Sequence, residues 1–84
     1  MLPHHNTPGI VMYCTSHCKG CKGSADYMIK HGIPYHPVNL DKNKNLVQPL
    51  VRETGLQMTP QIFVDGKFLG GMRQLVEAHQ RGLL

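Results

Sequence analysis

A chain of 84 residues is long enough for one small domain and too short to enclose a large substrate cavity. Nine Lys and Arg against five Asp and Glu leave a formal net charge of +4. The basic residues are scattered, without a basic run or interleaved aromatics, which argues against a nucleic acid partner. No apolar run approaches the roughly 20 residues needed to cross a bilayer, and the first residues lack a signal-peptide pattern. We therefore expect a soluble, cytoplasmic protein with no membrane partner.

The first third of the chain predicts a strand followed by a helix. Residues 1–8 carry two Pro and two His without periodicity, so we expect a flexible leader outside a single domain over residues 9–84. The apolar run Ile10–Cys14 is typical of a short strand that is covered on both faces. Apolar residues then recur at helical spacing up to a stop signal at Gly32, which predicts a helix over residues 19–31.

The middle of the chain predicts a second strand and a second helix. The strand is expected over Tyr35–Leu40, and Pro37 places it at a sheet edge because proline cannot donate a ladder hydrogen bond. Asp41 offers a cap for the apolar helical stripe that follows. Pro49 interrupts this stripe, so the helix either begins near Val47 or kinks.

The last third contains the clearest local signal, "QIFVDGKFLGG" at residues 61–71. Asp65-Gly66 joins two short apolar runs as a type I′ hairpin turn, in which both central residues can adopt positive φ. A final helical stripe runs from Leu75 to His79. The order is then βαβαββα, with a parallel crossover first and an antiparallel hairpin later. This order predicts an α/β, thioredoxin-like fold with a four-stranded mixed sheet flanked by helices.

The chemistry of the chain is concentrated in Cys18-Lys19-Gly20-Cys21, where the predicted first helix begins. The partial positive charge of a helix N-terminus favours a thiolate over a thiol, and nearby Lys and His residues add cationic character. Cys18 is therefore the predicted nucleophile. Cys21 lies one turn further into the helix, where it can attack a mixed disulfide on Cys18 and act as the resolving cysteine.

Metal binding is the alternative from another functional class. The spacing of Cys14, Cys18 and Cys21 also fits a [4Fe–4S] ligand set, and His17 could complete a zinc site with them. However, all four residues lie within eight positions and the usual distant second ligand pair is missing. We expect no metal site and no obligatory cofactor, and keep an iron–sulfur or metal-binding module as the rival hypothesis.

Thr59-Pro60 directly precedes the strand that is expected to run beside the first one. A cis X-Pro bond is a known way to turn the chain here, and it would leave the Thr59 N–H and C=O free for a bound peptide or glutathione. Tyr13 ends the first strand, where it either packs in the core or contacts substrate.

Together, "VMYCTSHCKGC", "MTPQIFVDGKFLGG" and the Gly70-Gly71 pair resemble the glutaredoxin family over about residues 9–83. The resemblance implies that Cys18 attacks a disulfide or a glutathionylated sulfur, that Cys21 completes dithiol reduction and that Pro60 is cis. It also implies glutathione as a co-substrate and protein disulfides such as that of ribonucleotide reductase as clients. We expect the protein to be a monomer. The expected substrate- and glutathione-binding residues are Tyr13, Lys19, Thr59, Pro60, Gly71, Met72 and Arg73.

Three features depart from the family pattern. Lys19 and Gly20 replace the usual Pro and aromatic, and Thr15 stands where a Lys is frequent. Met72, Arg73 and Gln74 occupy the region in which two acidic residues usually follow the Gly-Gly pair. The sequence therefore predicts a dithiol–disulfide oxidoreductase that draws electrons from glutathione or, alternatively, from thioredoxin reductase.

Overall fold

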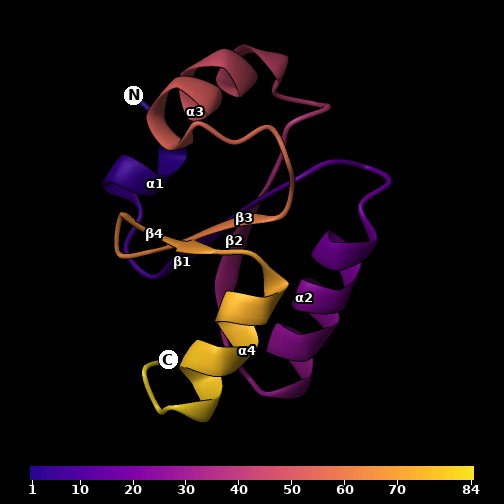
Figure 1. Cartoon of the computed structure of the whole chain (residues 1–84), viewed down its shortest axis with the longest axis vertical. Coiled ribbons are helices and arrows are strands. Elements are labelled where there is room, and N and C mark those ends of the chain that lie inside the picture. The colour runs from indigo at the N-terminus through magenta and orange to yellow at the C-terminus, as the bar shows by residue number, and fades with distance from the viewer.

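A computed structural model describes all 84 residues and shows one mixed sheet with helices packed on it (Figure 1). One short helix that the sequence did not predict precedes the first strand, and a 3-10 turn precedes the third helix. The elements are α1 (Pro3–Asn6), β1 (Ile10–Cys14), α2 (Lys19–Lys30), β2 (Tyr35–Asn39), the turn Lys44–Leu46, α3 (Val47–Thr54), β3 (Gln61–Val64), β4 (Lys67–Gly70) and α4 (Met72–Gln80). No helix is long and apolar enough to span a membrane.

The strand order β2-β1-β3-β4 confirms the predicted thioredoxin-like topology. β1 pairs in parallel with β2 and antiparallel with β3, and β3 pairs antiparallel with β4. Pro37 lies in the edge strand β2, where its missing N–H costs the sheet nothing. Although β2 ends at Asn39, the Leu40 N–H still donates to the Cys14 carbonyl at 2.7 Å. This bond holds the end of β2 against the end of β1, close to the cysteine loop.

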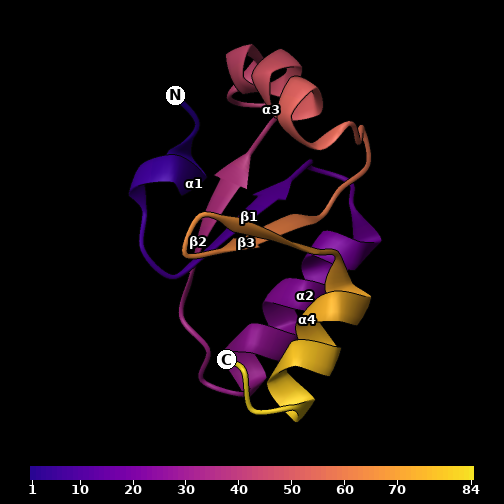
Figure 2. The ribbon, with the colours of Figure 1, turned by 60° about the vertical axis from the view of Figure 1, so that its left-hand side comes forward.

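The side chains of β1 divide the core into two layers. In both ribbon views α2 and α4 lie together on one face of the sheet, while α1 and α3 lie on the other (Figures 1 and 2). Ile10 and Met12 pack toward α2 and α4, whereas Val11 and Tyr13 pack toward α1 and α3. This alternation follows from the two-residue period of a strand. The remaining buried members are Met28, Ile62 and Leu75 on the first side and Leu2, Leu40, Leu50 and Phe63 on the second.

Two local predictions are confirmed by the backbone. α3 begins at Val47, so Pro49 occupies its third position, where an N–H has no partner within the helix. Asp65 and Gly66 have φ values of 49° and 82°, as the type I′ turn between β3 and β4 requires.

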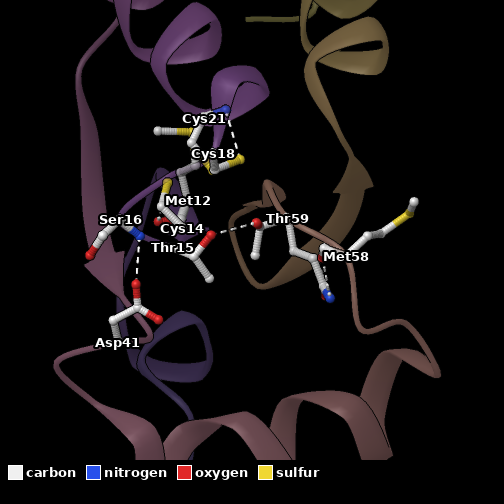
Figure 3. Close-up of a disulfide and its surroundings, with 10 residues drawn as sticks. Met12, Cys14, Thr15, Ser16, Cys18, Cys21, Asp41, Met58 and Thr59 are labelled. Atoms are coloured by element: carbon white, nitrogen blue, oxygen red, sulfur yellow. Dashed lines mark hydrogen bonds between the residues drawn. A yellow bond between two sulfur atoms is a disulfide. The ribbon is translucent and has the colours of Figure 1, made fainter.

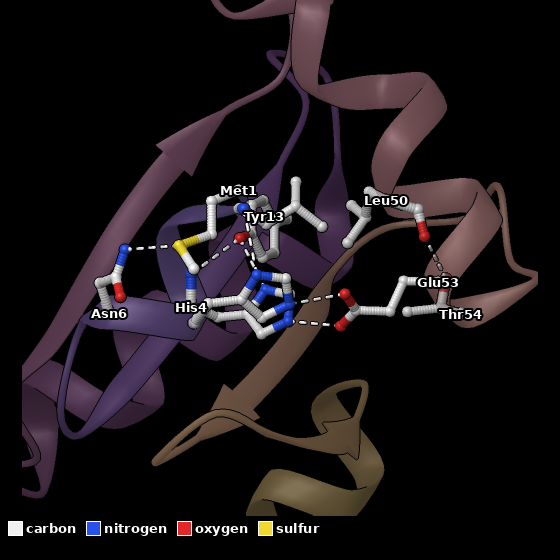
Figure 4. A network of polar contacts seen from close by, with 9 residues as sticks. Met1, His4, Asn6, Tyr13, Leu50, Glu53 and Thr54 are labelled. Atoms are coloured by element: carbon white, nitrogen blue, oxygen red, sulfur yellow. Dashed lines mark hydrogen bonds and ion pairs between the residues drawn. The ribbon is translucent and has the colours of Figure 1, made fainter.

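The structure differs from the expected flexible leader at residues 1–8. Leu2 and His4 are only 4% and 1% exposed. The His4 ring stacks on Phe63 with centroids 3.7 Å apart, and its Nδ1 lies 2.9 Å from the Tyr13 hydroxyl (Figure 4). All of these partners are distant in the sequence, so neither local periodicity nor composition could indicate that the segment packs.

We predict that a variant lacking residues 2–6 is destabilised by about 2 kcal/mol or more, because Leu2 leaves the core and the Tyr13 hydroxyl loses its partner. Urea unfolding monitored by circular dichroism measures this loss. An unfolding midpoint equal to that of the full chain would show that these residues contribute as little as a frayed leader.

Candidate active site

Cys18 and Cys21 form a disulfide at the start of α2, with their Cα atoms 5.1 Å apart (Figure 3). Cys18 is the N-cap residue of α2, and its Sγ accepts the Cys21 N–H at 3.1 Å. Cys18 is half-buried, whereas Cys21 is 5% exposed. The two sulfurs are therefore unequal: an attacking group can reach Cys18, and Cys21 is sheltered behind it.

The surroundings of Cys18 favour a negative sulfur once the disulfide is reduced. Cys18 lies at the N-terminus of α2, where the helix dipole is positive, and the Cys21 N–H already donates to its sulfur. A hollow of about 310 Å³ next to Cys18 is lined by His17, Lys19 and Lys22, together with Ser16. Lys22 pairs with Asp26 on the surface, while Lys19 is exposed with no carboxylate partner. These cations can stabilise the thiolate form of Cys18, or they can bind a carboxylate of a substrate.

Asp41 braces the loop that leads to Cys18, a role that the sequence did not indicate. Its carboxylate accepts the Ser16 N–H at 2.7 Å instead of capping the following helix (Figure 3). The hydrogen bonds from Ser16 lower the pKa of Asp41, so the carboxylate is ionised at neutral pH. Because this contact joins positions 16 and 41 across β1 and β2, only the folded chain reveals it.

The start of α2 forms one side of the site, and the turn at Thr59-Pro60 forms the other. The Thr59-Pro60 peptide bond is cis, as predicted. Pro60 lies directly against the first turn of α2: a Cβ placed on Gly20 would be 3.0 Å from Pro60 Cδ. The Thr59 hydroxyl is 3.3 Å from the Thr15 hydroxyl (Figure 3). The backbone N–H and C=O of Thr59 have no partner within the chain. An extended peptide could therefore add to the site as a further strand.

Gln61 holds this turn in place, and sequence reasoning missed it. The side chain is 2% exposed, and its Nε2 donates to the carbonyls of Leu56 and Met58 at 3.0 and 3.1 Å. Its partners are backbone carbonyls of the loop before Pro60, so no residue pattern could have indicated the contact.

A groove of about 540 Å³ adjoins the cis-proline turn and contains most of the predicted binding residues. Met58, Phe68 and Met72 form its apolar walls and are all exposed to solvent. Arg73 is its one charged residue and pairs with Glu77 at 3.3 Å. The groove includes Thr59, Pro60, Gly71, Met72 and Arg73, whereas Lys19 lines the hollow beside Cys18.

Tyr13 does not belong to this site, which corrects its assignment as a substrate-binding residue. Its side chain is fully buried on the α3 face of the sheet, and its hydroxyl accepts the His4 N–H at 3.1 Å (Figure 4). Burial raises the pKa of Tyr13. The reason for the error is the strand period: Met12 and Cys14 face α2, so the residue between them must face away from it.

The chain is similar to known proteins in both sequence and fold. The sequence model of the glutaredoxin family matches residues 10–69. Glutaredoxin-2 of Schizosaccharomyces pombe is 32% identical over 82 residues, which cover 94% of this chain and 74% of that protein. Glutaredoxin 3 of Escherichia coli is 23% identical over 73 residues, which cover 87% of this chain and 88% of that protein. The buckwheat glutaredoxin–glutathione complex has a TM-score of 0.82 and 25% identity, covering 96% of this chain and 76% of its own.

The family match includes β1, Cys18, Cys21, the Thr59-Pro60 turn and most of the β3–β4 hairpin. The match thus covers both cysteines, the start of α2 and the cis-proline turn, and it extends well beyond half of the chain. On this evidence the chain belongs to the glutaredoxin family and is a thiol–disulfide oxidoreductase.

Proposed function

We propose that the protein is a glutathione-linked dithiol oxidoreductase that reduces protein disulfides or glutathione mixed disulfides. The observation that carries this proposal is the unequal pair at the start of α2, with Cys18 accessible and Cys21 sheltered next to it. A single accessible thiol suffices to attack a glutathionylated sulfur. A second thiol within reach is what the reduction of a protein disulfide requires. We further propose that it acts as a cytoplasmic monomer, with ribonucleotide reductase among its clients.

The reaction follows from the positions of the two sulfurs. The Cys18 thiolate attacks one sulfur of the substrate disulfide, the S–S bond breaks, and the departing thiolate takes up a proton. Cys21 then loses its proton, attacks the Cys18 sulfur and releases the second substrate thiol. The substrate has gained two electrons, and the protein is left with the Cys18–Cys21 disulfide seen in the structure. Two glutathione thiols restore the dithiol and leave as glutathione disulfide.

The cis-proline turn and the groove supply binding groups for this substrate. The free N–H and C=O of Thr59 can pair with the backbone of an extended peptide such as glutathione. Lys19 and Arg73 offer cations to its carboxylates. The buckwheat relative, whose structure is a glutathione complex, supports glutathione as the ligand of this surface.

One feature of the groove favours thioredoxin reductase as the alternative electron donor. None of the twelve groove-lining residues is acidic, so the ammonium group of glutathione finds no carboxylate there. A charged group that loses water without gaining a partner weakens binding. If this loss dominates, the protein receives its electrons from a reductase that contacts the dithiol directly.

Cys14 takes no part in either route, and it is a poor partner in the rival metal-binding function. Burial raises the pKa of Cys14 to about 11, so its thiol stays protonated at neutral pH. Both nucleophilic attack and metal ligation need the thiolate. An iron–sulfur or zinc module would use Cys14, Cys18 and Cys21 as ligands, and Cys14 is a weak ligand because its thiol stays protonated.

Replacing each active-site cysteine by serine tests the assigned roles. We expect Cys18→Ser to abolish all activity. Cys21→Ser should keep reduction of a glutathione mixed disulfide within a few-fold and lose reduction of a protein disulfide, because only the second reaction needs a resolving thiol. Steady-state rates on the two substrates measure this difference. Equal losses for Cys21→Ser on both would contradict the division of roles.

Two coupled assays identify the electron donor. The purified protein is given a glutathione mixed disulfide either with glutathione and glutathione reductase, or with thioredoxin reductase, each with NADPH. We expect turnover in the glutathione system. Turnover only with thioredoxin reductase would establish the alternative donor. Absence of turnover in both systems would refute the oxidoreductase proposal and favour the metal-binding module.

The oxidised protein allows Cys14 to be tested alone, since Cys14 is then the one free thiol. We expect iodoacetamide to leave it largely unmodified at pH 7.5 and to label it progressively faster as the pH approaches about 11, its pKa. Unfolding in guanidinium should restore ordinary reactivity at lower pH. Rapid labelling of the native protein at pH 7.5, followed by mass spectrometry, would show that Cys14 is an accessible thiolate.

A further inference from the structure

Three potential metal ligands meet on the face of the sheet opposite the dithiol. His4 and His5 come from α1 and Glu53 from α3. His4 Nε2 lies 2.5 Å from Glu53 Oε2, and His5 Nε2 lies 2.6 Å from Oε1. The ligand atoms of the three residues all lie within 4.8 Å of one another. Figure 4 shows the Glu53 carboxylate facing the His4 ring, behind which the Tyr13 hydroxyl lies.

We propose that His4, His5 and Glu53 bind one divalent transition-metal ion, with Zn²⁺ as the representative. Two imidazoles and a carboxylate are a known three-residue zinc set that leaves a fourth position for water. The absence of thiolates and the presence of two nitrogens favour zinc-like ions over Mg²⁺ or Ca²⁺, which prefer oxygen ligands. No other group of three His, Cys, Asp or Glu side chains in the chain converges in this way.

The fold holds one ligand rigidly and leaves the other two accessible. His4 is stacked on Phe63, and its Nδ1 contacts the Tyr13 hydroxyl, so its Nε2 is fixed in direction. Such a second contact on the other ring nitrogen is usual for a metal-binding histidine. The side chains of His5 and Glu53 are 35% and 37% exposed, so an ion can reach them from solvent.

Metal binding at this site requires the imidazole protons of His4 and His5 to move, but it does not change the number of protons that the protein carries. In the metal-free state Glu53 accepts an N–H from each imidazole Nε2, and the Leu2 N–H donates to His5 Nδ1 at 3.2 Å. On metal binding each imidazole proton moves from Nε2 to Nδ1. His4 then donates to the Tyr13 oxygen across the existing contact, and the Tyr13 hydroxyl hydrogen must turn away from it. The Leu2 bond is lost. Because these rearrangements oppose binding, we expect micromolar affinity.

A metal ion at this site would join the N-terminal segment to α3. The site shares no residue with the dithiol or its groove and lies across the sheet from α2. Metal binding would therefore stabilise the folded chain by an amount that grows with the logarithm of the ratio of free ion to its dissociation constant, independently of whether the proposed function holds.

Zinc titration of the full, oxidised protein tests the proposal, because the disulfide removes Cys18 and Cys21 as competing ligands. We expect calorimetry with ZnCl₂ to give one ion per chain. Zinc at about 100 times the dissociation constant should raise Tm by about 10 °C relative to protein in EDTA. Absence of saturable binding up to about 1 mM Zn²⁺ would overturn the proposal.

Variants at the two accessible ligands assign the ion to this site. We expect His5→Gln and Glu53→Gln each to weaken zinc binding at least about tenfold and to lose most of the Tm increase. His4 is left unchanged because it is part of the core. His79→Gln is the matched control, since His79 and His31 form the other close histidine pair, with ring centroids 4.8 Å apart. Parent-like binding by both ligand variants, or loss of binding in the control, would overturn the proposal.

Discussion

The central strand β1 is the constraint on which the rest of the structure depends. It lies between β2 and β3, and helices cover both faces of the sheet, so its side chains must alternate between two separate layers of the core. This alternation directs Met12 and Cys14 toward α2 and Tyr13 toward α3. The loop that follows β1 ends at Cys18, the N-cap residue of α2.

Two segments that are far apart in the sequence pack together to form the active site. The first turn of α2 supplies the two sulfurs, and the cis-proline turn supplies an unpaired backbone edge beside them. Gly20 permits this approach, because the space that a larger residue would fill is taken by the Pro60 ring. Buried or anchored side chains hold both segments: Asp41 restrains the cysteine loop and Gln61 restrains the turn. The catalytic cysteines thus act from a rigid frame, while the apolar groove next to them stays open to solvent.

The opposite face of the sheet serves a different purpose. There the N-terminal segment completes the core around Tyr13 and Phe63, and its two histidines meet the carboxylate of Glu53. Partial burial by itself would raise the pKa of Glu53, but the interactions with His4 and His5 together outweigh it and lower the pKa. The sheet separates this polar cluster from the redox chemistry, so stability and catalysis can be altered independently in this small domain.

The sequence by itself determined the features that depend on neighbouring residues. The strand Ile10–Cys14, the hairpin at Asp65-Gly66, the start of α3 ahead of Pro49 and the dithiol at a helix N-terminus all follow from propensities and spacings within a few positions. Only the tertiary structure decided which residues meet across the fold. It buried Tyr13, ordered Leu2 and His4, and brought Glu53 to a pair of histidines 48 and 49 positions away. Contacts at such separation come from the packing of complementary surfaces, which leaves no periodic signal in the chain.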